Sequence, residues 1–102
     1  MLSKIPIDVG ELRQENINKE ILRVSIIAEL DAVNLYEQLF DMTDDISLRK
    51  ILSSVIEEEK THIGEFEALL LKMDSEQEKE LSKGKKEAEE LLGNEESEKA
   101  CD

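Results

Sequence analysis

The sequence is short of the residues that build most globular cores. Among 102 residues it has no tryptophan, one tyrosine, two phenylalanines, one proline and one histidine. So little aromatic surface excludes a wide core, and abundant Leu, Ile, Glu and Lys favour helix throughout a single domain. No apolar run is long enough to span a bilayer, and no charged-then-apolar leader opens the chain. We therefore expect a cytoplasmic protein with no membrane partner.

Cysteine and positive charge are also scarce. Cys101 is the only cysteine, so the chain cannot close a disulfide within itself, and we assign this thiol no function. Thirteen basic residues stand against 26 acidic ones, which gives a formal charge of −13. Such a surface repels nucleic acid and attracts cations wherever carboxylates converge. Metal ions are therefore the class of partner that the electrostatics favours.

The apolar pattern predicts a helical hairpin behind an N-terminal arm. Residues 1–17 show no clear period and are expected to form an arm that docks on another surface. Residues 18–73 carry two helical patterns, the first starting at the expected N-cap Asn18, with a short break at Thr43–Asp45. A break this short predicts that the two helices lie antiparallel.

The C-terminal part is more polar. Residues 74–93 are expected to form one or two short helices, interrupted at Gly84 and ending at Gly93. Residues 94–102 are expected to be a disordered acidic tail or a linker. The predicted fold class is all-α: an antiparallel two-helix hairpin with a short C-terminal helix.

Each of the two long helices carries a stripe of side chains at alternating spacings of four and three residues. The stripe of the first helix comprises Leu22, Ile26, Glu29, Val33, Tyr36 and Phe40. That of the second comprises Leu48, Leu52, Val55, Glu59, His62, Phe66, Leu69 and Met73. Glu29, Glu59 and His62 interrupt otherwise apolar stripes, where an unpaired charge is costly unless it is neutralised, paired or bound to a cation. A bound metal ion would remove that cost.

Glu29, Glu59 and His62 make up half of the ligand set of a carboxylate-bridged di-metal site. In a four-helix bundle such a site takes one Glu from each of two helices and a Glu-x-x-His pair from each of the other two. A two-fold axis would supply all six ligands from two chains, and a hairpin needs a second hairpin to bury its apolar stripes. We therefore expect a homodimer that closes a four-helix bundle around the metals. Oxygen ligands, one nitrogen donor per chain and no nearby cysteine favour iron, with manganese as the alternative.

A purely structural role is the alternative for the polar residues of the stripes. A lone histidine on an apolar face is more often a hydrogen-bonded core residue than a ligand, and Glu-x-x-His is common in acidic helices. The metal interpretation is favoured because Glu59 and His62 both fall on the stripe, opposite Glu29. Tyr36, one heptad after Glu29, is either an ordinary core residue or a hydrogen-bond partner of a ligand carboxylate.

Two segments, EILRVSIIAELDAVNLYEQ (residues 20–38) and EEEKTHIGEFEALLL (residues 57–71), resemble the encapsulated ferritins, which are housed inside encapsulin nanocompartments. The resemblance implies a dimer that builds a di-iron ferroxidase site, with dimers assembled into a homodecameric ring through the third helix. It also implies that Glu59 bridges the irons, that Glu29 and His62 are terminal ligands, and that Tyr36 sits beside the site.

The resemblance also implies an encapsulin shell protein as partner and the nanocompartment as location. Many members end in a short apolar targeting peptide, and the terminal GNEESEKACD contains none. Some relatives are fused ahead of the shell protein, so we expect either the front of such a fusion or a free-standing chain. The leading hypothesis is a ferroxidase that oxidises Fe(II) with dioxygen or peroxide for mineral stored elsewhere. The alternatives are a peroxide-scavenging di-iron protein and a non-enzymatic helical oligomerisation module.

Overall fold

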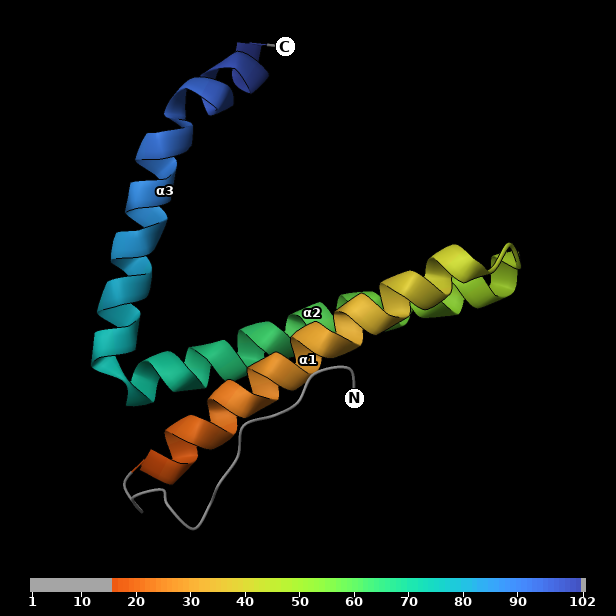
Figure 1. Ribbon diagram of the computed structural model, residues 1–102, viewed down its shortest axis with the longest axis horizontal. Coiled ribbons are helices and arrows are strands. Elements are labelled where there is room, and N and C mark those ends of the chain that lie inside the picture. Colours follow the sequence, from red (N-terminus) through yellow and green to blue (C-terminus); the bar gives the residue numbers. More distant parts are fainter. Residues whose placement is uncertain (1–15, 102) are drawn as a thin grey trace.

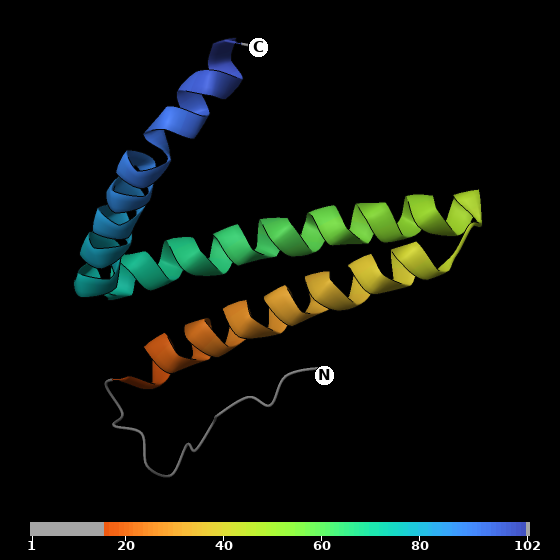
Figure 2. The same ribbon diagram turned by 45° about the horizontal axis from the view of Figure 1, so that its top comes forward.

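The structure, a computed structural model, describes residues 16–101 of the chain, and the side chains of residues 16–93. Helix α1 spans Ile17–Met42, α2 spans Ile46–Met73 and α3 spans Ser75–Cys101, and this part of the chain contains no strand. The predicted all-α class is confirmed. Helices α1 and α2 run side by side as an antiparallel hairpin, and the chain turns sharply at the end of α2 into α3, which diverges from the hairpin (Figures 1 and 2).

The N-terminal boundary of the hairpin differs slightly from the expected one. Helix α1 begins at Ile17 after the N-cap residue Asn16, whose side chain makes no capping hydrogen bond. The predicted N-cap, Asn18, therefore lies inside the first turn. Such shifts are ordinary because helix ends fray. The predicted arm lies outside the described residues, except for its last two.

The short connection between α1 and α2 is closed by local hydrogen bonds. The Asp45 N–H donates to Thr43 Oγ1 at 3.2 Å, and the Asp45 carboxylate accepts a hydrogen bond from the Leu48 N–H at 2.7 Å as the N-cap of α2. Arg49 donates to the Thr43 carbonyl at 3.3 Å, and its guanidinium carbon lies 4.1 Å from the centroid of the Phe40 ring. An N-cap of this kind contributes about 1 kcal/mol. These contacts explain why the chain reverses within three residues.

Packing between α1 and α2 buries few side chains. Within residues 16–93 the buried ones are Leu22 and Val33 of α1 and Leu70 of α2. Leu70 does not belong to the predicted stripe of α2, whose members Leu69 and Met73 are exposed. A strict seven-residue repeat drifts by about 20° per heptad on a straight helix. Near its C-terminal end, α2 therefore turns Leu70 rather than the predicted Leu69 toward α1.

Much apolar surface of the hairpin is left uncovered. Its exposed large apolar side chains are Ile21, Ile27, Leu30, Leu35, Leu39, Met42, Ile46, Leu48, Ile51, Leu69 and Met73. Exposed apolar surface beyond scattered single residues is typical of a face that another chain covers. Two packed helices without a further layer thus form no closed core, as expected from the sequence. Among the described helices, none has an apolar stretch sufficient to cross a membrane.

Helix α3 is longer than predicted. It passes through Gly84 without interruption and continues beyond Gly93 to Cys101, so the predicted helix end at Gly93 is wrong and residues 94–101 are helical rather than disordered. A linker role for the acidic tail stays a prediction. Neither glycine adopts a positive φ. A glycine inside a helix costs about 1 kcal/mol relative to alanine. That cost is too small to end a helix that is otherwise rich in glutamate, lysine and leucine.

Candidate metal centre

Glu29, Glu59 and His62 meet midway along the hairpin. Glu29 lies 13 residues before Met42, the last residue of α1, and Glu59 lies 13 residues after Ile46, the first residue of α2. Equal distances from a tight turn bring two residues of antiparallel helices opposite each other. His62 follows Glu59 by three residues and shares its side of α2. The structure therefore brings together the three candidate ligands that the sequence singled out.

The three side chains form a close cluster. Each offers one ligand atom, and these atoms all lie within 4.8 Å of one another. His62 Nδ1 is 3.7 Å from Glu29 Oε2 and 3.8 Å from Glu59 Oε2. Hydrogen bonds from nitrogen to oxygen span about 2.7–3.2 Å, so neither contact is one. The space between the three atoms suits a shared cation better than a shared proton.

Both carboxylates are largely shielded from solvent. The side chains of Glu29 and Glu59 are 21% and 19% exposed, and that of His62 is 44% exposed. Glu29 Oε2 is itself buried and has no hydrogen-bond partner within the described part of the chain. Leaving a buried acceptor unpaired costs about 1–3 kcal/mol, and more if the group is charged. A cation placed between the three side chains would satisfy this oxygen.

The donor set fits a transition metal. Nitrogen and oxygen ligands of zinc lie about 2.0–2.2 Å from the ion, which puts two ligands of one such ion roughly 3–4 Å apart. The two distances from His62 Nδ1, 3.7 and 3.8 Å, fall within that range. Two carboxylates and one imidazole without a thiolate match iron or manganese rather than a sulfur-rich structural zinc site. Three ligands from one chain leave such an ion incompletely coordinated.

The exposed edge of His62 borders a shallow hollow on the flank of α2. The hollow has a volume of about 300 Å³ and is lined by Ser54, Glu57, Glu58, Thr61, His62 and Glu65. Its three glutamates fall outside the predicted stripe. Carboxylates gathered in this way produce a negative potential that attracts cations. A cation that approaches His62 from solvent therefore meets an acidic surface first.

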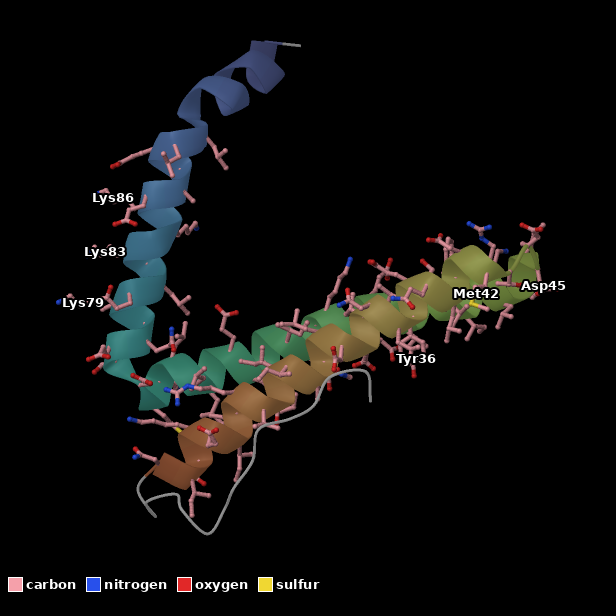
Figure 3. The ribbon with its side chains drawn as sticks, viewed as in Figure 1. Tyr36, Met42, Asp45, Lys79, Lys83 and Lys86 are labelled. Carbon is pink, nitrogen blue, oxygen red and sulfur yellow. The ribbon has the colours of Figure 1, made fainter. Side chains whose placement is uncertain are left out.

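Tyr36 makes no hydrogen bond to the cluster within residues 16–93. The side chain is half-buried, and Figure 3 places it at the edge of α1. It follows Glu29 by seven residues and so lies on the same side of the helix. A role for Tyr36 beside a metal stays a prediction.

Sequence reasoning missed an ion pair at the open end of the hairpin. Arg23 Nη2 donates to Asp74 Oδ2 at 2.7 Å, although the residues are 51 positions apart. No spacing rule connects two residues so distant in sequence. The available signal was helix length: α1 and α2 have 26 and 28 residues, so the start of α1 must lie beside the end of α2.

The chain matches one family of known proteins over most of its length. A family model described as EncFtn-like matches residues 5–84. The ferritin-like–encapsulin shell fusion protein of Pyrococcus furiosus is 58% identical over 74 residues, which cover 72% of this chain and 21% of the fusion. The encapsulin nanocompartment cargo protein EncC of Myxococcus xanthus is 43% identical over 56 residues, which cover 55% of this chain and 43% of that protein. The chain thus spans less than half the length of either relative.

A solved structure shares the arrangement of helices. The crystal structure of the encapsulated ferritin domain from Pyrococcus furiosus superimposes with a TM-score of 0.77 at 49% sequence identity. The match covers 91% of this chain and 97% of that domain. At this level of identity the likeness extends to the sequence as well as the fold.

Proposed function

The chain belongs to the EncFtn-like family, and from that premise we propose that it is a ferroxidase with a di-iron site shared between two chains. The expected resemblance to encapsulated ferritins is confirmed. The observation that carries the proposal is the buried, unpaired Glu29 Oε2, 3.7 Å from His62 Nδ1. This oxygen belongs to a cluster that contains half of a di-iron ligand set.

In this proposal a second hairpin completes the site. Each chain contributes Glu29, Glu59 and His62, and a two-fold axis doubles them to six ligands. Ile51 and Leu69 support this arrangement, because both are exposed and lie on the same side of α2 as His62, eleven residues before it and seven after it. A partner that covers these apolar side chains therefore also reaches His62.

The three proposed ligands would have different roles in the oxidation of Fe(II). Glu59 of each chain would be shared between the two iron ions, and Glu29 and His62 would each hold one ion. Each Fe(II) gives up one electron, and one molecule of dioxygen or peroxide takes both. Four carboxylates then favour the ferric product by neutralising its higher charge. Manganese would fit the same ligands, and iron is the metal we propose.

We further propose that the dimers form a homodecameric ring inside an encapsulin nanocompartment in the cytoplasm. An open ring encloses no cavity, so Fe(III) would leave for mineral stored by the shell. Support for the compartment comes from the two relatives, one named as a fusion with an encapsulin shell and the other as an encapsulin cargo protein. Both a fused and a separate arrangement therefore occur among proteins similar to this chain.

Anaerobic loading with Fe(II), followed by addition of dioxygen, tests the proposed activity. The expected result is one bound iron per chain and rapid formation of Fe(III), measured by metal analysis and ultraviolet absorption. Turnover of peroxide without net ferric product would instead identify a peroxide-scavenging protein. A chain that binds no iron under anaerobic loading would be an oligomerisation module, and the ferroxidase proposal would be wrong.

The oligomer is expected to depend on metal. Four carboxylates and two imidazoles converge in the proposed dimer, and the carboxylates repel one another when no cation lies between them. Native mass spectrometry near the dissociation concentration should therefore show smaller species without metal and larger ones with Fe(II). The same mass distribution with and without Fe(II) would contradict a site at the subunit interface.

A further inference from the structure

Asp74 is the single residue between α2 and α3, and all of its polar atoms are engaged. Its Oδ1 accepts a hydrogen bond from the Gln77 N–H at 3.0 Å, which caps α3, and its Oδ2 accepts one from Arg23 Nη2 at 2.7 Å. The Asp74 N–H donates to the Leu70 carbonyl at 2.9 Å, and the Asp74 carbonyl accepts from the Glu78 N–H at 3.1 Å. One residue is thus bonded to all three helices.

The contact between Arg23 and Asp74 is a well-supported ion pair. The Asp74 side chain is 13% exposed, and the Glu20 carboxylate lies 3.9 Å from the second terminal nitrogen of Arg23. The hydrogen bond from Gln77, together with the charges of Lys19 and Arg23, holds the pKa of Asp74 below its ordinary value of 3.8 despite the opposing effect of burial. Asp74 is therefore charged at neutral pH, and charge-assisted hydrogen bonds are stronger than neutral ones.

Packing does not hold α3 in its place. Residues 78–92 are all exposed, and the helix extends away from the hairpin in both views of the chain (Figures 1 and 2). A helix without packed side chains, joined through one residue, is free to swing about that residue unless another contact prevents it. Among the hydrogen bonds and ion pairs of the described chain, the Arg23–Asp74 pair is the one that links α1 to this junction.

We propose that the ion pair between Arg23 and Asp74 fixes the direction in which α3 leaves the hairpin. Arg23 is anchored on α1 and holds the carboxylate that caps α3. Rotation of α3 about the junction would pull the cap away from either Arg23 or Gln77. Within one chain, the direction of α3 thus depends on one ion pair between helices, and this coupling is independent of the proposed iron chemistry.

The Arg23–Asp74 ion pair would therefore determine which side of α3 faces the hairpin and which side faces away from it. Lys79, Lys83 and Lys86 project from the side of α3 that faces away from the hairpin (Figure 3). Helical spacing puts Leu81 and Leu92 on the opposite side, and both are exposed. When the direction of α3 is fixed, the side that carries Leu81 and Leu92 faces the space between α3 and the hairpin.

Asp45 offers a matched control. It caps α2 as Asp74 caps α3, accepting a hydrogen bond from the Leu48 N–H at 2.7 Å. No ion pair reaches Asp45 from another helix among the side chains of residues 16–93. Asp45→Ala therefore removes a helix cap of the same kind without removing a contact between helices.

The direction of α3 is measured as a distance between spin labels. Labels are attached at Ser54→Cys on α2 and Ser82→Cys on α3, both exposed positions, in the full chain with Cys101→Ser. Labelled chains are diluted into unlabelled ones, so that pulsed electron spin resonance reports distances within one chain. The parent protein is expected to give one narrow distance peak. Asp74→Ala and Arg23→Met are expected to lose it, while Asp45→Ala keeps it.

Two outcomes overturn the proposal. The first is a narrow, unshifted peak in both Asp74→Ala and Arg23→Met, and the second is equal broadening in Asp45→Ala. Circular dichroism checks that each variant keeps its helices. Arg23→Met leaves the cap of α3 intact, so it tests the ion pair even if Asp74→Ala does not fold.

Discussion

Replacing either Glu59 or His62 by alanine is expected to abolish rapid Fe(II) oxidation. Each substitution removes two of the six proposed ligands, because the two-fold axis repeats every loss. Loss of a residue that only hydrogen-bonds to a metal ligand already lowers metal affinity or activity by about 10–100-fold. The loss of two ligands should therefore lower the rate of Fe(II) oxidation by at least that factor. The helices should persist, since the hairpin loses polar groups and keeps its apolar ones. Stopped-flow absorption of Fe(III), with helix content from circular dichroism, measures both effects.

Glu67→Ala provides the control for this experiment. Glu67 lies on the same helix and is exposed, and it belongs neither to the cluster nor to the hollow beside His62. Its replacement changes the net charge as Glu59→Ala does, so it separates a ligand effect from a general loss of negative charge. Wild-type rates in Glu59→Ala or His62→Ala would remove that residue from the site. An equal loss in Glu67→Ala would show that overall charge, rather than these ligands, controls the rate.

In mixtures of wild-type and His62→Ala chains, the remaining activity is expected to be proportional to the square of the wild-type fraction. With random pairing, only dimers of two intact chains hold all six ligands. A site built within one chain would behave differently, because each wild-type chain would keep its own activity whatever its partner. The mixtures are prepared by refolding the chains together, and mass spectrometry checks that the pairing is random.

The shape of the mixing curve decides between the two models. A straight line through the origin would exclude the shared site and the ferroxidase model built on it. Pairing a variant that lacks Glu29 with one that lacks His62 adds an independent check. These mixed dimers keep four of six ligands in every arrangement, so activity should not be restored. Mixtures of wild-type and Glu67→Ala chains should stay fully active at every ratio.

The hairpin and its cluster were predictable because both depend on local rules. The turn chemistry around Asp45 and the helical periods on either side set the register, and the register alone places Glu29 opposite Glu59. Leu70 was missed because the drift of a heptad pattern accumulates along a straight helix. The length of α3 was underestimated because the cost of Gly84 and Gly93 was given more weight than their neighbours allow.

The junction at Asp74 was not predictable in the same way. Its cap to Gln77 follows a local pattern, but its bond to Arg23 depends on where two helices of similar length end. The roles expected of Tyr36 and of the second hairpin also lie beyond one chain. A single chain contains half of the proposed ligand set, and its fold brings these three side chains together.

The small number of buried side chains couples folding to concentration. A hairpin that buries only Leu22, Val33 and Leu70 among its described residues gains little from folding alone, and obligate homodimers often have no stable folded monomer. In the proposed dimer, folding and pairing would form one bimolecular reaction, so dilution would unfold the chain and expose isolated copies to proteases. Confinement of many copies in one small volume would keep each of them folded by mass action, whatever the metal contributes.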